Sequence, residues 1–171
     1  MLWIKAYYHI RAFWIKLFWK LIYGNRLRMG EKTTFRRNFT IALEDTGVVT
    51  IGAGCFFNHD CSISCRGDVQ IGNETLFGEN VKIYDHNHRF AETGPIKEQG
   101  YSVGEIRIGN HCWIGSNVTF LKGAQVGDGC VIGTGCIING PIPENTIVTT
   151  QPQYYVQPIE RRISKNTRRI Q

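Results

Sequence analysis

The chain has 171 residues, 42% of them hydrophobic, which suffices for one domain with a buried core but not for two large ones. Residues 1–30 contain six Lys and Arg and no acid, and residues 159–171 contain five against one Glu, so the net charge of +6 leaves the stretch between them mildly acidic. That stretch lacks the basic face with interspersed stacking aromatics that is typical of nucleic-acid binders, and nucleic acid is therefore not an expected partner.

Residues 2–23, within an N-terminal segment 1–30, are expected to form an amphipathic helix. At 100° per residue, Lys5, His9, Lys16 and Lys20 fall in one stripe about 60° wide, and most of the remaining surface is apolar. The charges make a membrane-spanning helix unsuitable. Two interpretations stay open: the helix lies on a membrane surface with its cations near anionic headgroups, or it packs on the rest of the protein or on a neighbouring subunit.

An apolar residue then recurs every six positions, with one slip of two residues and one long interruption. A period of six excludes an amphipathic α-helix, whose apolar stripe returns every three or four residues. Short strands joined by tight turns fit instead, each forming one side of a triangular coil with its apolar residue inward. The sequence thus predicts an all-β solenoid over residues 31–150, with inward positions at Ile51, Phe57, Ile63, Ile71, Phe77, Ile83, Ile108, Ile114, Phe120, Val126, Ile132 and Ile138.

Glycine often follows the inward residue, and we expect it to supply corner conformations that are closed to other residues. Five of the six cysteines lie four positions after an inward residue, in a slot that otherwise accepts mostly small side chains. This regular placement favours a structural role over a redox or nucleophilic one. The N-terminus lacks the apolar core and cleavage site of a signal peptide, so we expect reduced thiols in a cytosol.

The repeat is interrupted at residues 84–105, a polar stretch with four Gly and Pro residues and two histidines near its start. A solenoid gains nothing from interrupting its stack, and long loops in compact proteins are usually functional or disordered. This segment is therefore expected to be a loop that projects from the coil. After residue 150 the chain continues as a basic tail, 151–171.

The repeat, the loop opening YDHNH, the stretch IGNHCWIGSNVTFLKGAQVGDGCVIGTGC and the ending PIPENTIV resemble the hexapeptide acyltransferases. The resemblance covers roughly residues 48–150 and is strongest to galactoside and maltose acetyltransferases and to capsule or exopolysaccharide O-acetyltransferases. It implies a left-handed parallel β-helix, a homotrimer with active sites at subunit contacts, acetyl-CoA as co-substrate and no metal. It also implies that His88 is the catalytic base and that Asn58, one to two coils earlier, contacts the acceptor.

The same resemblance assigns the remaining candidate residues. The acetyl-CoA contacts that it implies are Trp113, Ser116, Lys122, Gly133 and Gly140. The acceptor contacts that it implies are Phe57, Asn58, Arg66, Asp85 and His86. Arg66 stands where some sugar acetyltransferases have an acid, and the segment after PIPENTIV departs from the family pattern, so neither an unmodified galactoside nor the usual details of CoA binding need apply.

The expected reaction is acetyl transfer to a sugar hydroxyl of a cell-surface polysaccharide or its lipid-linked precursor, at the cytoplasmic face of the membrane. An imidazole suits it because its ordinary pKa near ~6.5 lets it accept the hydroxyl proton and return it to the leaving thiol, without an acyl-enzyme. His86 either orients His88 or faces water. Three alternatives remain: N-acetylation of an amino sugar, a γ-carbonic-anhydrase-like metal enzyme, and a non-catalytic scaffold.

Overall fold

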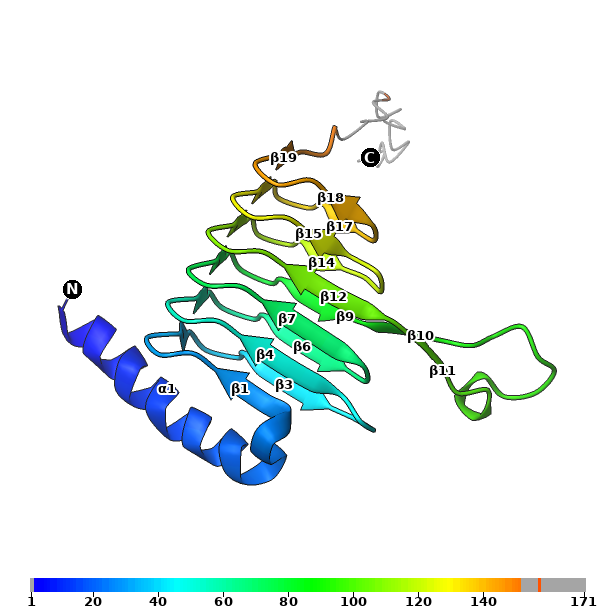
Figure 1. Ribbon diagram of the computed structural model, residues 1–171, viewed down its shortest axis with the longest axis horizontal. Helices are drawn as coiled ribbons and strands as arrows, with labels where there is room; N and C mark the ends of the chain where they lie inside the picture. The colour runs from blue at the N-terminus through cyan, green and yellow to red at the C-terminus, as the bar shows by residue number, and fades with distance from the viewer. Residues whose placement is uncertain (1, 152–156, 158–171) are drawn as a thin grey trace, which may run out of the picture.

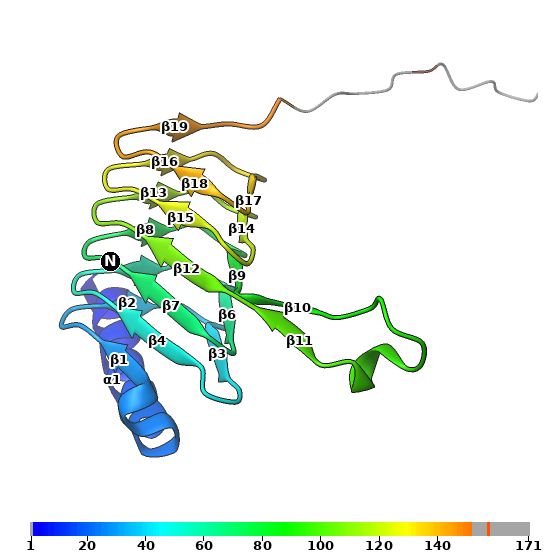
Figure 2. The same ribbon diagram turned by 45° about the vertical axis from the view of Figure 1, so that its right-hand side comes forward.

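The computed structural model describes residues 2–151 and Gln157, and it has the form of a three-sided prism with a helix at one end (Figures 1 and 2). The first sheet contains β1 (Leu27–Met29), β4 (Val48–Ile51), β7 (Asp68–Ile71), β12 (Glu105–Ile108), β15 (Gln125–Val126) and β18 (Pro141–Ile142). The second contains β2 (Thr34–Phe35), β5 (Phe56–Phe57), β8 (Leu76–Phe77), β13 (Trp113–Ile114), β16 (Val131–Ile132) and β19 (Ile147–Val148). The third contains β3 (Thr40–Leu43), β6 (Ser62–Cys65), β9 (Lys82–Tyr84), β14 (Thr119–Phe120) and β17 (Ile137–Ile138).

Successive strands along the chain belong to successive sheets, so each circuit of the three sides makes one coil. Every pairing between neighbouring strands within these sheets is parallel and brings equivalent repeat positions together, as in the pairing of Ile63 with Ile83. We name the corners by the sheets they join: the second–third corner follows the strands of the second sheet, and the third–first corner follows those of the third. These two corners hold the candidate site residues.

The core is a column of the inward residues that the period of six predicts. All twelve predicted positions are buried, each with at most 4% of its surface exposed. Phenylalanine rings stack along one edge of this column, with centroids 4.5 Å apart between Phe39 and Phe57 and 4.3 Å apart between Phe57 and Phe77. The solenoid prediction is therefore confirmed, and close apolar stacking between coils stabilises it.

The glycines that follow the inward residues have a different purpose from the one expected. None of them has a positive φ; that conformation falls on later turn residues such as Gly54, Asn80 and Asn117. At Gly52 an added Cβ would lie 2.6 Å from the backbone of Gly72 in the next coil, and at Gly115 it would lie 2.7 Å from the backbone nitrogen of Thr134. Glycine is needed because consecutive coils approach so closely here that a side chain would not fit.

All six cysteines are free and buried, in agreement with a structural role. The Cys61 thiol lies 3.2 Å from the Gly78 carbonyl oxygen of the next coil, and the other slot cysteines make similar contacts. Burial raises the pKa of the Cys61 thiol to about 11. Burial, together with the neighbouring Asp85 carboxylate, raises the pKa of Cys65 to about 12.

These pKa values predict a loss of stability in alkali. Below the ordinary thiol pKa of 9.0 both states keep their protons, and the Cys61 and Cys65 contribution is fully present. As the pH rises above 9, the unfolded chain loses protons that the folded chain retains, so the free energy of unfolding should fall. Urea denaturation between pH 7 and 10.5 should show this decline, and the Cys61→Ala/Cys65→Ala variant should decline less steeply. Equal slopes for both proteins would contradict the assignment.

The coil begins before the region where the repeat is obvious. The first coil consists of β1, β2 and β3, so it starts at Leu27 rather than at residue 31. Helix α1 (Leu2–Tyr23) and the short 3-10 helix η1 (Gly24–Arg26) precede it, and α1 lies against this end of the stack (Figure 1). The Trp19 ring packs on Phe35 and Phe39, with centroids 5.2 and 5.8 Å away, and extends the aromatic stack. The Tyr23 hydroxyl donates a hydrogen bond to the Ile41 carbonyl oxygen.

The interruption of the repeat is a β-hairpin that leaves the third–first corner between β9 and β12. Strands β10 (His86–His88) and β11 (Tyr101–Val103) pair antiparallel, and the 3-10 helix η2 (Ile96–Glu98) lies in the loop that joins them. Figure 2 shows the hairpin projecting sideways from the prism. The coil continues undisturbed, because β12 pairs with β7 and β14 pairs with β9. The prediction that this segment projects from the coil is thus confirmed.

Candidate functional site

The base of the hairpin is fixed to the coil by a buried carboxylate, that of Asp85. Its side chain has no exposed surface. One oxygen accepts a hydrogen bond from the Arg66 backbone N–H at 3.0 Å, and the other accepts one from the Gly67 N–H at 2.7 Å. The first oxygen also lies 2.8 Å from His86 Nδ1. A carboxylate occupied in this way fixes the hairpin base to the coil, and the expected contact of Asp85 with the acceptor stays a prediction.

Tyr101, on β11, is the residue around which the hairpin base is assembled. It pairs with His88 across the hairpin, and its ring centroid lies 4.5 Å from that of His88 and 5.3 Å from that of His86. The Arg66 guanidinium stacks on it at 3.4 Å from the ring centroid. Residues two apart on a strand share a face, which explains why both histidines contact one ring. Sequence analysis did not identify Tyr101.

Arg66 is held in place by neighbours on the same corner. Its guanidinium forms ion pairs with Glu44 and Asp45 of the preceding coil, and only 11% of its side-chain surface is exposed. Between these carboxylates and the Tyr101 ring, little of the guanidinium is left for an acceptor. Arg66 thus supports the ring on which His88 packs, and its expected contact with the acceptor stays a prediction.

His88 itself is exposed and lines a cavity of about 320 Å³ at the hairpin base. Arg89, Phe90, Ser102 and Lys122 are among the other lining residues. Lys122 lies on the third–first corner of the next coil, and its ammonium group donates a hydrogen bond to the Ser102 hydroxyl at 2.6 Å. The cavity thus combines an imidazole, two cations, the carboxylate of Glu92 and an aromatic ring. This composition suits a ligand that has both phosphate and apolar parts.

The second–third corner holds another group of candidate residues. Asn58, Ser116 and Gly133 lie on it in three different coils, immediately after or close to the strands β5, β13 and β16, with the coil of β8 between the first two. The Asn58 side-chain oxygen accepts a hydrogen bond from the His59 backbone N–H, and the Ser116 hydroxyl accepts one from the Glu79 N–H. This local turn orients the Asn58 side chain. Its NH₂ group donates no hydrogen bond to the residues that the structure describes.

Trp113 and Phe57 both lie on the second sheet, but they face opposite ways. Trp113 is on β13 with 60% of its surface exposed, so its ring is available on the outer face of the prism. Phe57 is only 1% exposed and is stacked between Phe39 and Phe77. The position of Phe57 in the repeat directs its side chain into the core and away from the surface where an acceptor was expected to touch it.

The predicted residues therefore form two separate groups within one chain. His88, Lys122 and Gly140 lie at or next to the third–first corner, whereas Asn58, Ser116 and Gly133 lie on the second–third corner. The third sheet separates the two. Among residues 2–151 and 157, no hydrogen bond links Asn58 to His88, and no group of three His, Cys, Asp or Glu side chains could hold a metal ion.

The sequence is similar to that of known bacterial transferases. Residues 105–140 match the family model described as bacterial transferase hexapeptide, six repeats. A Mycobacterium tuberculosis protein named as an acetyltransferase is 32% identical over 78% of this chain and 43% of its own length. WbbJ of Escherichia coli, named as a lipopolysaccharide biosynthesis O-acetyl transferase, is 30% identical over 74% of this chain and 68% of its own length.

Solved structures confirm the fold. A hexapeptide-repeat acetyltransferase of Vibrio cholerae superposes with a TM-score of 0.64 at 21% identity, covering 76% of this chain and 72% of that one. The same protein has also been solved in complex with acetyl coenzyme A. At this identity the likeness concerns the fold alone, and it confirms the left-handed β-helix. The chain spans less than half of the Mycobacterium relative and about two thirds of WbbJ.

Proposed function

Because the chain belongs to the bacterial hexapeptide-repeat transferase family, we propose that it transfers an acetyl group from acetyl-CoA to a sugar hydroxyl. The acceptor is a cell-surface polysaccharide or its lipid-linked precursor. Support for the donor comes from the acetyl coenzyme A bound to the Vibrio cholerae protein, and support for the acceptor comes from the name of WbbJ.

One observation carries the proposal: His88, Arg89 and Lys122 line a single cavity at the base of the hairpin. A thioester reaction with coenzyme A needs a proton acceptor near the acyl carbon and cations near the phosphates. The imidazole supplies the first, and the guanidinium and ammonium groups supply the second. Phe90 adds an apolar wall that suits the pantetheine arm.

In the proposed reaction His88 takes the proton of the acceptor hydroxyl as its oxygen attacks the thioester carbonyl. The C–S bond then breaks, the acetyl group remains on the sugar oxygen, and the imidazolium returns the proton to the sulfur. Contact with Tyr101 holds the His88 ring in place, and the Asp85 carboxylate fixes the strand that presents it. The Asn58 side-chain amide donates to the carbonyl oxygen as it becomes negative. No acyl-enzyme forms.

We further propose that the active protein is a homotrimer. The residues expected to act together lie on two corners of one prism, and the third sheet separates them. If the third–first corner of one protomer faces the second–third corner of the next, His88 of the first meets Asn58 of the second. In a threefold arrangement each of the three protomer contacts brings one His88 to one Asn58, and no such corner is left without a partner. The proposed location is the cytoplasmic face of the cell membrane, where acetyl-CoA and a lipid-linked glycan are both accessible.

The test is acetyl-CoA turnover by the purified protein with a panel of acceptors. The panel contains neutral oligosaccharides, amino sugars and lipid-linked glycans, and the assay measures release of free coenzyme A thiol together with the acetylated product. We expect turnover that depends on a hydroxyl acceptor and yields an ester that mild alkali removes. An alkali-stable amide on an amino sugar would contradict O-transfer, and no acceptor-dependent thiol release would contradict the function.

A further inference from the structure

Helix α1 has two apolar sides, of which the coil covers only one. Ala12, Ile15 and Trp19 pack against the first coil. Among the side chains that the structure describes, the opposite side exposes ten large apolar residues: Trp3, Ile4, Tyr7, Ile10, Phe13, Trp14, Leu17, Phe18, Leu21 and Ile22. We call these ten residues the outer face. Their spacing of three and four forms one continuous stripe, far beyond the scattered apolar residues that are normal on a protein surface.

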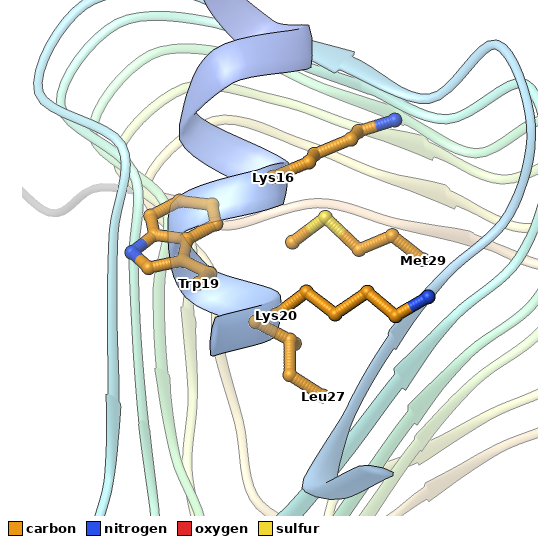
Figure 3. A pocket seen from close by; sticks show the side chains of 5 residues that line it. All are labelled: Lys16, Trp19, Lys20, Leu27 and Met29. Atoms are coloured by element: carbon orange, nitrogen blue, oxygen red, sulfur yellow. The ribbon is translucent and has the colours of Figure 1, made fainter. Parts of the chain in front are cut away.

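Cations border the outer face. Figure 3 shows the Lys16 and Lys20 side chains extending in the same direction from α1, on either side of Met29; together with Trp19 they line a pocket between the helix and β1. Residues 1–37 contain nine Lys and Arg and one acid, Glu31, while residues 38–150 contain six Lys and Arg against twelve acids. The end of the molecule that bears the exposed apolar stripe is thus strongly basic, and the rest of the coil is acidic.

From this arrangement we propose that the outer face of α1 binds an anionic lipid bilayer. The apolar side chains enter the boundary between headgroups and acyl chains, and the flanking ammonium and guanidinium groups lie among the lipid phosphates. A second copy of this chain suits the face less well, because pairing two such ends would bring two strongly basic segments, residues 1–37 of each copy, together. None of the helices among residues 2–151 is long and apolar enough to span a bilayer, so the helix binds along the surface.

The docked orientation places the hairpin at a definite height, and this step rests on the proposed function. With α1 on the membrane, the end of the coil that holds β1–β3 is nearest to it (Figure 1). The hairpin leaves the stack after β9, two strand positions beyond β3, which adds about 10 Å at about 4.8 Å per strand. The helix itself adds about 10 Å. His88 would then stand about 20 Å from the bilayer, within reach of sugars linked to a lipid.

Vesicle binding tests the docking independently of catalysis. The full chain is sedimented with vesicles of equal parts phosphatidylcholine and phosphatidylglycerol, and with vesicles of phosphatidylcholine alone. We expect binding to the first that weakens at high salt, and little binding to the second. Leu21→Glu and Trp14→Glu, at exposed positions of the outer face, should each weaken binding at least about tenfold. Ile147→Glu, equally exposed on β19 at the far end of the coil, is the matched control and should bind normally.

Several outcomes would overturn the docking. These are equal binding to both vesicle types, unchanged binding by Leu21→Glu, or a smaller oligomer for Leu21→Glu by light scattering without any vesicle binding, which would show that a second copy covers the face. Transfer assays separate docking from the proposed reaction. Leu21→Glu should acetylate a soluble glycan at the wild-type rate but a vesicle-anchored one more slowly. No transfer to either acceptor by the wild-type protein, with vesicle binding intact, would contradict the function and leave the docking supported.

Discussion

Replacement of His88 with alanine should lower kcat for acetyl transfer about 10²- to 10⁴-fold and leave the fold intact. The magnitude is that of a positioned general base, and His88 is the imidazole that lines the cavity. Because His88 is exposed and packs only on Tyr101, its removal should change the melting temperature little. The measurement is the steady-state rate with a saturating acceptor, together with thermal unfolding of the same preparations.

Two other histidine variants make this test specific. His111→Ala changes an exposed histidine at a corner remote from the hairpin and should keep wild-type kcat. His86→Ala removes the ring held by Asp85, and we expect a partial loss, because it supports the strand but does not line the cavity. Wild-type activity in His88→Ala together with an inactive His86→Ala would transfer the role of base to the Asp85–His86 pair, whose geometry resembles an acid-oriented catalytic histidine.

Replacement of Asp85 with alanine should be the most damaging change at the hairpin base. It leaves the N–H groups of Arg66 and Gly67 without their acceptor in a buried position and removes the partner of His86. Loss of hydrogen bonds to a buried charged group costs about 3 kcal/mol, which corresponds to a fall of about 10 °C in Tm for a chain of this size. Acetyl transfer should fall as well, because the strand that presents His88 loses its anchor.

Differential scanning calorimetry and hydrogen exchange of the β10 and β11 amides measure these two effects. Asp85→Asn keeps an oxygen acceptor and should lose less stability than Asp85→Ala. Asp68→Ala breaks a partly exposed ion pair with Arg107 and should cost less than about 1 kcal/mol, so it is the matched control. An Asp85→Ala protein that melts like the wild type and exchanges its hairpin amides as slowly would show that the carboxylate does not anchor the hairpin.

Most of the coil could be predicted from the sequence, because each strand needs an apolar residue at its inward position and these positions recur every six residues. Only the first strand, β1 (Leu27–Met29), lies before the predicted start of the solenoid at residue 31. Met29, Phe35 and Ile41 keep the period of six, but ten positions separate Ile41 from the next inward residue, Ile51. This break in phase hides the first strand from a search for a regular period. Close approach of neighbouring coils, and not a special backbone conformation, determines where glycine is needed, so its absence is tolerated where the spacing permits.

The candidate site was only partly predictable. The projecting segment and its histidines follow from the interrupted repeat, but Tyr101 reaches His88 only because β10 and β11 pair with a particular register across the loop. Likewise Asp85 looks like an ordinary loop acid in the sequence, and its burial becomes apparent only when Arg66 and Gly67 are brought above it by the coil. Contacts between the hairpin and the coil follow no sequence repeat, so a single sequence gives no regular pattern from which to predict them.

At the corner between β9 and β12 the chain can become longer or shorter without loss of any strand pairing within the prism. Each of these strands is paired with neighbours in the coils before and after it, so neither depends on the segment between them for its position. An exchanged or extended hairpin could therefore present new side chains to a different acceptor while the frame stays as it is. A change of acceptor specificity would then require a new hairpin at this one corner and no change in the core.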